Sequence, residues 1–132
     1  MSLNGNAATG ESGEARMLGA LVIAAGLAVL GIAWAGKIGK LPRNHFAGIR
    51  LPSTMRSDRA WAAGHRAGWA MTSISSLFLV ALGIRIIAVG ADRAEDGSWW
   101  FLGPMLLTLV IGAIQGHRAA KAEYTKEQGE AL

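Results

Sequence analysis

The sequence lacks cysteine entirely, and only 17% of its 132 residues are charged. Without a thiol there are no disulfides, no zinc–thiolate sites and no cysteine nucleophile. Soluble domains carry about 25% charged residues, whereas this chain is 52% hydrophobic and has a mean hydropathy of +0.32. These values argue against a soluble enzyme and against a disordered chain.

Catalytic and metal-binding motifs are also missing. The sequence contains no G-x-S-x-G, no phosphate-binding glycine loop and no paired carboxylates within its apolar stretches. The sequence offers few side chains that could bind a metal, only three histidines (His45, His65 and His117) and one acid in the central loop. We therefore predict a protein that is not an enzyme and has no cofactor and no metal.

Three apolar blocks dominate what is present. They cover about residues 17–35, 67–91 and 99–116, and the only charge within them is Arg85. A bilayer core about 30 Å thick needs roughly 20 apolar residues in a helix. The sequence predicts an all-α integral membrane protein with three transmembrane helices, in a membrane domain over residues 17–118. Ala33-Trp34-Ala35 resembles a signal-peptide cleavage site, but the preceding tail lacks a basic region, so we expect the first span to be retained.

Basic residues gather on one side of these spans. Residues 36–66 hold seven Lys and Arg against the single acid Asp58, and the tail 119–132 adds more basic residues. The positive-inside rule predicts a cytoplasmic loop at 36–66, a cytoplasmic tail at 119–132 and a disordered extracytoplasmic tail at 1–16. Because the charge follows membrane orientation, nucleic-acid binding is disfavoured, and the bilayer itself is the expected partner.

The central loop has the sequence of an ordered element at the membrane interface. Pro42 and Pro52 keep the chain extended. Ser57 is a candidate N-cap for a helix that carries Trp61, His65 and Trp69 at a spacing of four residues and continues into the second span. We predict that this loop is an ordered element at the interface, which folds either against the membrane or into the helix bundle.

This loop resembles the SdpI family of small bacterial membrane proteins. The residues that carry the resemblance are Asn44, Gly48, Ile49, Arg50, Pro52, Thr54, Trp61 and His65. The chain departs from the pattern at Leu51, where many relatives have Thr, and it lacks the extra N-terminal membrane segments of longer members. It therefore looks like a minimal, three-helix version of the family.

The resemblance implies a location in the bacterial cytoplasmic membrane and a role in immunity to, or sensing of, a membrane-active peptide toxin. A family member protects its producer against a secreted peptide and sequesters a cytoplasmic repressor, so a toxin and a cytoplasmic regulator are candidate partners. Two alternatives stay open, because a shared family does not guarantee a shared role. They are an accessory subunit of a larger membrane complex and a small oligomeric transporter or lipid-handling protein.

Several side chains have more than one interpretation at this point. Arg50 either anchors a phosphate or carboxylate or is one more positive-inside charge, and Asn44 is expected to bond the loop backbone. His65 either titrates as a switch or hydrogen-bonds within the loop. Arg85 is expected to snorkel to the outer surface, where Asp92 or Asp96 offers a partner, and a transporter would need it inside the bundle.

Small residues line one side of each span and predict close helix packing. They are Ala20, Ala24 and Ala28 on the first, Thr72 and Ser76 on the second, and Gly112 and Gly116 on the third. A line of this kind left facing lipid would indicate a homo-oligomer or a larger complex.

Overall fold

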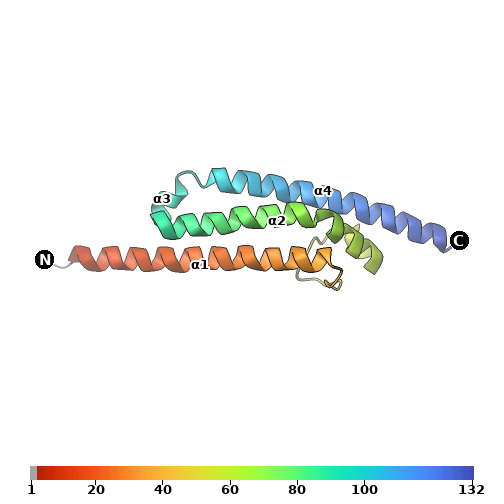
Figure 1. The fold of residues 1–132 in the computed structure, drawn as a ribbon, viewed down its shortest axis with the longest axis horizontal. Coiled ribbons are helices and arrows are strands. Elements are labelled where there is room, and N and C mark those ends of the chain that lie inside the picture. The colour runs from red at the N-terminus through yellow and green to blue at the C-terminus, as the bar shows by residue number, and fades with distance from the viewer. Residues whose placement is uncertain (1–2) are drawn as a thin grey trace.

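The computed structural model describes residues 3–132, with side chains from residue 8 onward. Within these residues the chain is helical and has no strand (Figure 1). The elements are α1 (Leu3–Lys37), the short 3-10 helix η1 (Thr54–Arg56), α2 (Asp58–Val89), α3 (Ala91–Glu95) and α4 (Trp99–Glu130).

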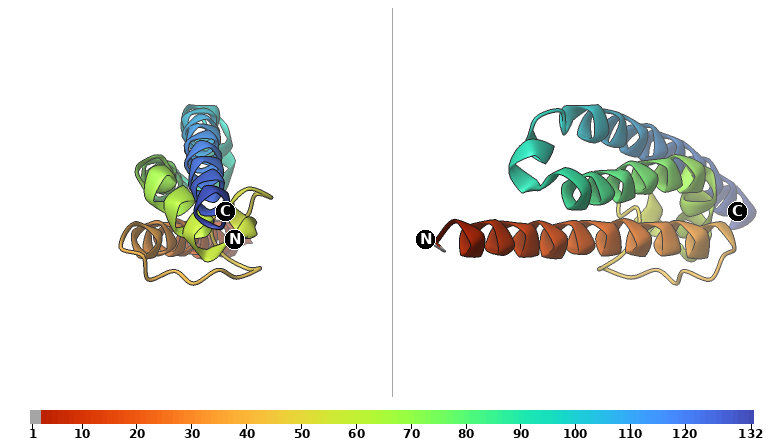
Figure 2. Two further views of the ribbon diagram at one scale, coloured as in Figure 1. Left: turned by 90° about the vertical axis from the view of Figure 1, so that its right-hand side faces the viewer. Right: turned by 60° about the vertical axis from the view of Figure 1, so that its left-hand side comes forward.

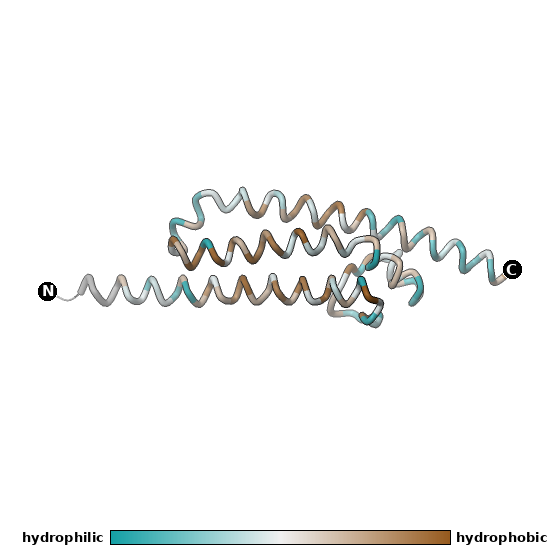
Figure 3. The backbone as a smooth tube through the Cα atoms, viewed as in Figure 1, coloured by the Kyte–Doolittle hydropathy of each residue, from teal (hydrophilic) through white to brown (hydrophobic). Residues whose placement is uncertain are grey.

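Three of these helices, α1, α2 and α4, are long and apolar enough to cross a membrane. Figure 3 shows hydrophobic residues concentrated in the middle of the bundle, while hydrophilic residues gather near the hairpin and toward the C-terminus. Many large apolar side chains of these helices are exposed, among them Met17, Leu21 and Leu107. An apolar surface of this extent is what lipid covers in a membrane protein. The predicted all-α fold with three membrane-length helices is confirmed, while its orientation stays a prediction.

Helix α2 is the centre of the bundle. It packs against α1 on one side and against α4 on the other, and the short α3 turns the chain between α2 and α4 (Figures 1 and 2). Within the described residues, no Cα atom of α1 comes within 8 Å of a Cα atom of α4. The two outer helices are therefore held together through α2 and the loop, and a space is left between them.

Glycines set the closest helix contacts. A Cβ on Gly83 of α2 would lie 2.7 Å from the carbonyl oxygen of Gly19 on α1. On the other side of α2, a Cβ on Gly68 would lie 2.8 Å from the carbonyl oxygen of Gly112 on α4. Helices in lipid gain little from burying apolar groups, so such backbone approach is a main source of their packing energy.

The small residues predicted on α4 lie in this packing, and those predicted on α1 do not. Gly112 and Gly116 are buried against α2, whereas Ala20, Ala24 and Ala28 are exposed. The packed face of α1 is instead the one that carries Ala15, Gly19, Gly26, Ala33 and Gly36, all of which are buried. These positions recur at intervals that keep one face of a helix turned toward its neighbour.

The beginning of α1 corrects one prediction. Residues 3–16, expected to be part of a disordered tail, continue the helix, while residues 1–2 lie outside the described part of the chain. Extending an existing helix adds one hydrogen bond per residue without a new nucleation step. Ala15, near the end of this extension, is buried against Leu82 and Ile86 of α2, a packing contact that composition alone does not reveal.

We expect the substitution Gly83→Ala to destabilise the bundle. The added methyl would have to displace the backbone of α1, because it would also lie 2.9 Å from the amide nitrogen of Ile23. Such overpacking costs about 1–3 kcal/mol. Thermal melting of helical circular dichroism in mild detergent measures the loss.

Gly31→Ala is the matched control, since a Cβ there meets nothing within 4 Å. It keeps the gain in helix propensity without the clash, so its melting temperature should equal or exceed that of the wild type. Equal melting temperatures for the two variants would contradict the glycine-packing account.

Candidate functional site

The loop between α1 and α2 is folded onto the start of α2 and onto α4. Its last residue, Ser57, caps α2 by accepting a hydrogen bond from the Ala60 amide at 3.0 Å. The same hydroxyl donates to Glu127 of α4 at 2.6 Å. The predicted N-cap and the continuation of this helix into the second span are both confirmed, and the cap also joins the loop to the far end of the chain.

Trp61 and His65 form the core of the site. Trp61 is 2% exposed, and its indole N–H donates to the Leu41 carbonyl at 2.8 Å. Its ring stands 4.1 Å from the His65 ring, centroid to centroid, at 37°. Both aromatic residues of the motif therefore face inward and hold the loop, rather than a ligand, against α2.

Both nitrogens of the His65 ring are used. Nε2 accepts a hydrogen bond from the Ile49 amide at 2.8 Å, and Nδ1 lies 2.8 Å from the Trp61 carbonyl. A carbonyl accepts only, so Nδ1 carries the proton and Nε2 is the bare nitrogen. His65 thus serves as a neutral link between its own helix and the loop, which favours the second of its two interpretations.

Two glycines make room for this histidine. A Cβ on Gly36 of α1 would lie 2.8 Å from the His65 Cβ, and one on Gly48 would run into His65 Nε2. Gly48 also has φ +107°, a conformation that side chains with a Cβ rarely adopt. Glycine at position 48 therefore meets two requirements at once, a backbone turn and a close approach to the ring.

Asn44 and Thr54 satisfy the backbone of the loop. The Asn44 Oδ1 accepts from the amides of Phe46 and Ala47 at 2.9 Å and 2.7 Å. Thr54, fully buried, accepts from the Leu51 amide at 3.0 Å, and its hydroxyl lies 2.7 Å from the Ile49 carbonyl. Backbone groups that are shielded from water are costly to leave unpaired, so these side chains satisfy groups that the folded loop partly buries.

Two arginines of the loop also bond its backbone. Arg50 donates to the His45 carbonyl, and Arg43 donates to the Met55 carbonyl at 2.8 Å while pairing with Asp58 at 3.1 Å. Arg50, like Pro52, is otherwise on the exposed side of the loop. Arg50 therefore helps to hold the loop through part of its guanidinium, and the residue is still exposed.

The most exposed apolar residue of the loop was not among the residues predicted from the sequence. Phe46 is 92% exposed, although the amide of the same residue is fixed by Asn44. Ile49 of the same loop is instead turned inward, because its Cδ1 fills the space at Gly68 and Gly116 between α2 and α4. The sequence does offer one signal for Phe46, because an aromatic residue between turn-forming residues in a loop is a candidate for binding.

A charged cluster ties the start of α2 to the end of α4. Arg59 donates to Glu123 at 2.6 Å and to Glu130 at 2.7 Å. His117 of α4 also lies 2.9 Å from the hydroxyl of Ser53, in the loop. Each exposed ion pair is worth little alone, but together these contacts fix α4 relative to the loop.

Arg85 lies at the opposite end of α2 from this site. Its guanidinium donates to the carbonyls of Asp96 at 2.7 Å and Arg93 at 3.4 Å. It reaches the end of the bundle, as the snorkelling interpretation expects, but it bonds backbone carbonyls of the hairpin rather than the carboxylate of Asp92 or Asp96. Its role in the structure is to hold the hairpin that joins α2 to α4.

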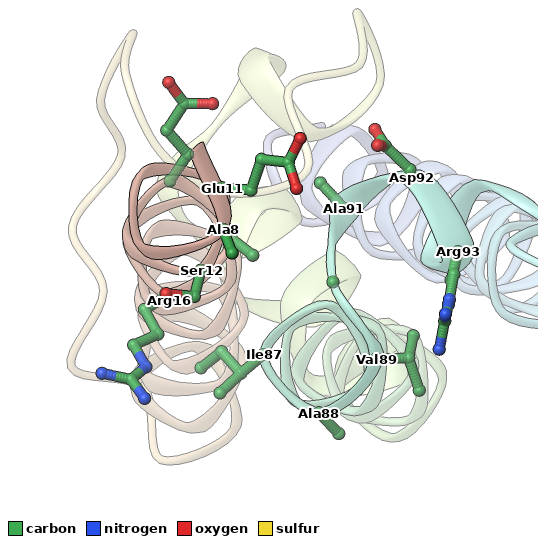
Figure 4. A pocket seen from close by; sticks show the side chains of 13 residues that line it. Ala8, Glu11, Ser12, Arg16, Ile87, Ala88, Val89, Ala91, Asp92 and Arg93 are labelled. Atoms are coloured by element: carbon green, nitrogen blue, oxygen red, sulfur yellow. The ribbon is translucent and has the colours of Figure 1, made fainter. Parts of the chain in front are cut away.

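A pocket of about 430 Å³ also lies at the hairpin end. Figure 4 shows Glu11 of α1 and Asp92 beside its opening, with the Ile87 side chain pointing from α2 toward α1. The lining mixes acidic and basic groups, including Arg16 and Arg93. Within residues 3–132, no cluster of three or more His, Asp or Glu side chains has the arrangement of a metal site.

Comparison with known proteins separates these two regions. Residues 40–115 match the sequence model of the SdpI/YfhL protein family. The match includes the loop, α2 and the first half of α4, whereas the wall of the hairpin pocket that α1 provides lies outside it. No curated protein and no solved structure matches the chain. The loop cluster is accordingly the stronger candidate for a function that belongs to the family.

We expect Gly48→Ala to release the loop from α2. The substitution combines a strained backbone with a clash against His65, at a cost on the order of 1–3 kcal/mol. Hydrogen–deuterium exchange of the peptide covering residues 44–56, followed by mass spectrometry, should become roughly tenfold faster.

Gly39→Ala is the control for this experiment. Gly39 also has a positive φ of +74°, but a Cβ there meets nothing within 4 Å. It carries the backbone strain without the clash. If both variants accelerate exchange equally, the contact with His65 is not what fixes the loop.

Proposed function

The chain belongs to the SdpI/YfhL family, and from this premise we propose that it gives its producer immunity to, or senses, a membrane-active peptide. It acts in the bacterial cytoplasmic membrane and without catalysis. The observation that carries the proposal is the loop itself, in which the residues of the family motif hold one small exposed surface in a fixed shape. That surface consists of His45, Phe46 and Arg50.

The polar groups of the motif support a binding role over a catalytic one. His65 uses both ring nitrogens, Asn44 bonds two amides, and Thr54 is fully buried. A general base or nucleophile must reach the substrate with a free atom. Side chains that are fully engaged in holding a loop do not meet this condition.

The exposed surface has the chemistry of a peptide-binding site. Phe46 offers an apolar ring, and Arg50 offers a guanidinium a few residues away. Aromatic and arginine side chains are the commonest anchors at protein interfaces. Because Asn44 and His65 hold the loop before a partner arrives, binding there would cost little ordering entropy.

The test is expression of the chain in a host that is sensitive to membrane-active peptides, with growth measured against a panel of them. We expect the wild type to raise the inhibitory concentration of at least one peptide, and Phe46→Ala and Arg50→Ala to lower it again. Loss of an interface anchor typically costs about 2 kcal/mol, which is roughly 30-fold in affinity. Trp61→Ala should also remove protection, since it deletes the side chain that holds the loop against α2.

Hydrogen exchange distinguishes the loss of a contact with the peptide from the loss of the structure of the loop. Phe46→Ala should leave exchange of the loop unchanged, whereas Trp61→Ala should accelerate it. Trp100→Ala is the matched control, because this residue is an 81% exposed aromatic near the hairpin, and it should protect fully. If the variants and the wild type, at equal protein levels, gave the same inhibitory concentrations across the panel, the proposal would be contradicted.

A second function is favoured by one separate observation. Ala20, Ala24 and Ala28 form an exposed line of small residues on α1, the kind of face against which another transmembrane helix packs closely. An accessory subunit of a larger membrane complex would use it. Arg85, by contrast, gives a transport role no support, since its guanidinium is bonded to the hairpin.

Purification from the native host in mild detergent tests this second function. A stoichiometric membrane partner that is lost on Ala24→Phe, but retained with the control Ala25→Phe, an exposed position about 100° further around α1, would establish the accessory role. Recovery of the chain alone, with the same yield for all three proteins, would count against it.

A further inference from the structure

The space between α1 and α4 forms an apolar groove of about 320 Å³ along one face of α2. Val29 and Ala33 line it on α1, Leu109 and Ala113 on α4, and Trp69 on α2, while Ile49 of the loop closes one end. The groove exists because the outer helices do not touch. It is near the lower limit of ligand-pocket volumes, about 300 Å³, which suits a narrow occupant.

The position of the groove determines what surrounds it. Its walls fall at residues 29–33, 69–72 and 109–113, inside the apolar stretch of each membrane-length helix. In a bilayer the groove therefore opens to hydrocarbon and not to water. Apolar walls with no atoms opposite them lose their dispersion contacts, so a hydrocarbon chain that enters the groove restores contacts on both sides.

A cation is fixed where the groove meets the loop. Lys37, one turn beyond Ala33, holds its ammonium 3.9 Å from the ring centroid of Trp69 and 4.8 Å from that of Trp34. Trp69 thus lines the groove and positions the lysine as well. Within the described residues, Lys37 has no carboxylate within 4.0 Å, so its charge is free to pair with an anion from outside the chain.

We propose that this groove binds one acyl chain of an anionic glycerophospholipid from the bilayer, with the lipid phosphate against Lys37. The apolar walls select a hydrocarbon chain, and the lysine at the loop end selects an anionic headgroup. This site is distinct from the exposed surface of the loop, and the proposal does not depend on immunity or sensing.

The test is native mass spectrometry of the full chain in detergent, titrated with phosphatidylglycerol or with phosphatidylcholine of the same acyl chains. We expect one phosphatidylglycerol per chain to bind, with about fivefold preference over phosphatidylcholine, the difference that one interfacial lysine supplies. Lys37→Gln should bind both lipids equally. Lys40→Gln, which removes an exposed lysine nearby, should keep the preference.

A second pair of variants tests the groove. Ala113→Phe fills it from α4 and should abolish the bound lipid, whereas Ile114→Phe, on an exposed position of the same helix, should keep it. Val29→Phe fills the groove from α1 and replaces Ala113→Phe if that variant does not fold by circular dichroism.

Three outcomes would overturn the proposal. These are equal wild-type affinity for the two lipids, lipid retained by both groove-filling variants, or a groove filled by a second copy of the chain, which would appear as a dimer mass lost on Ala113→Phe. The lipid titration and the growth assay with peptides measure different surfaces of the chain. The failure of one proposal therefore does not decide the other.

Discussion

Close approach of helix backbones at glycine is the constraint on which this structure depends. In lipid, apolar side chains gain little by leaving one hydrocarbon environment for another, so three helices stay together only where their backbones come near. Helix α2 has such contacts on two sides, through Gly83 toward α1 and through Gly68 toward α4. With both outer helices held by α2 and not by each other, the groove between them follows directly.

The loop obeys a second constraint, the need to satisfy the backbone groups that its own folding buries. Its amides and carbonyls bond to side chains at Asn44, Thr54, Trp61 and His65. These residues are also the ones that resemble the family pattern, which gives the pattern a physical meaning. They specify the shape of the loop, whereas Phe46, in the surface that this shape presents, is not one of the residues of the pattern.

Much of this arrangement follows from the sequence. The apolar blocks predict the membrane helices, Ser57 predicts the start of α2, and the loop motif predicts an ordered element. The packed face of α1 was not predictable in the same way, because Ala20, Ala24 and Ala28 are as small and as regularly spaced as the buried Gly19, Gly26 and Ala33. Only the position of α2 decides between the two faces. Similarly, the burial of Ala15, near the end of the helical segment at residues 3–16, comes from packing with Leu82 and Ile86, which lie far from it in the sequence.

The groove and the loop share a wall. His65 and Gly48, which hold the loop by the close contact between them, also line the end of the groove. An occupant that packs against these residues is bound more tightly when the loop is in place than when it is released, and the loop is stabilised by the same free energy in return. The exposed surface at Phe46 and Arg50 and the apolar space between α1 and α4 are therefore two ends of one hydrogen-bonded element.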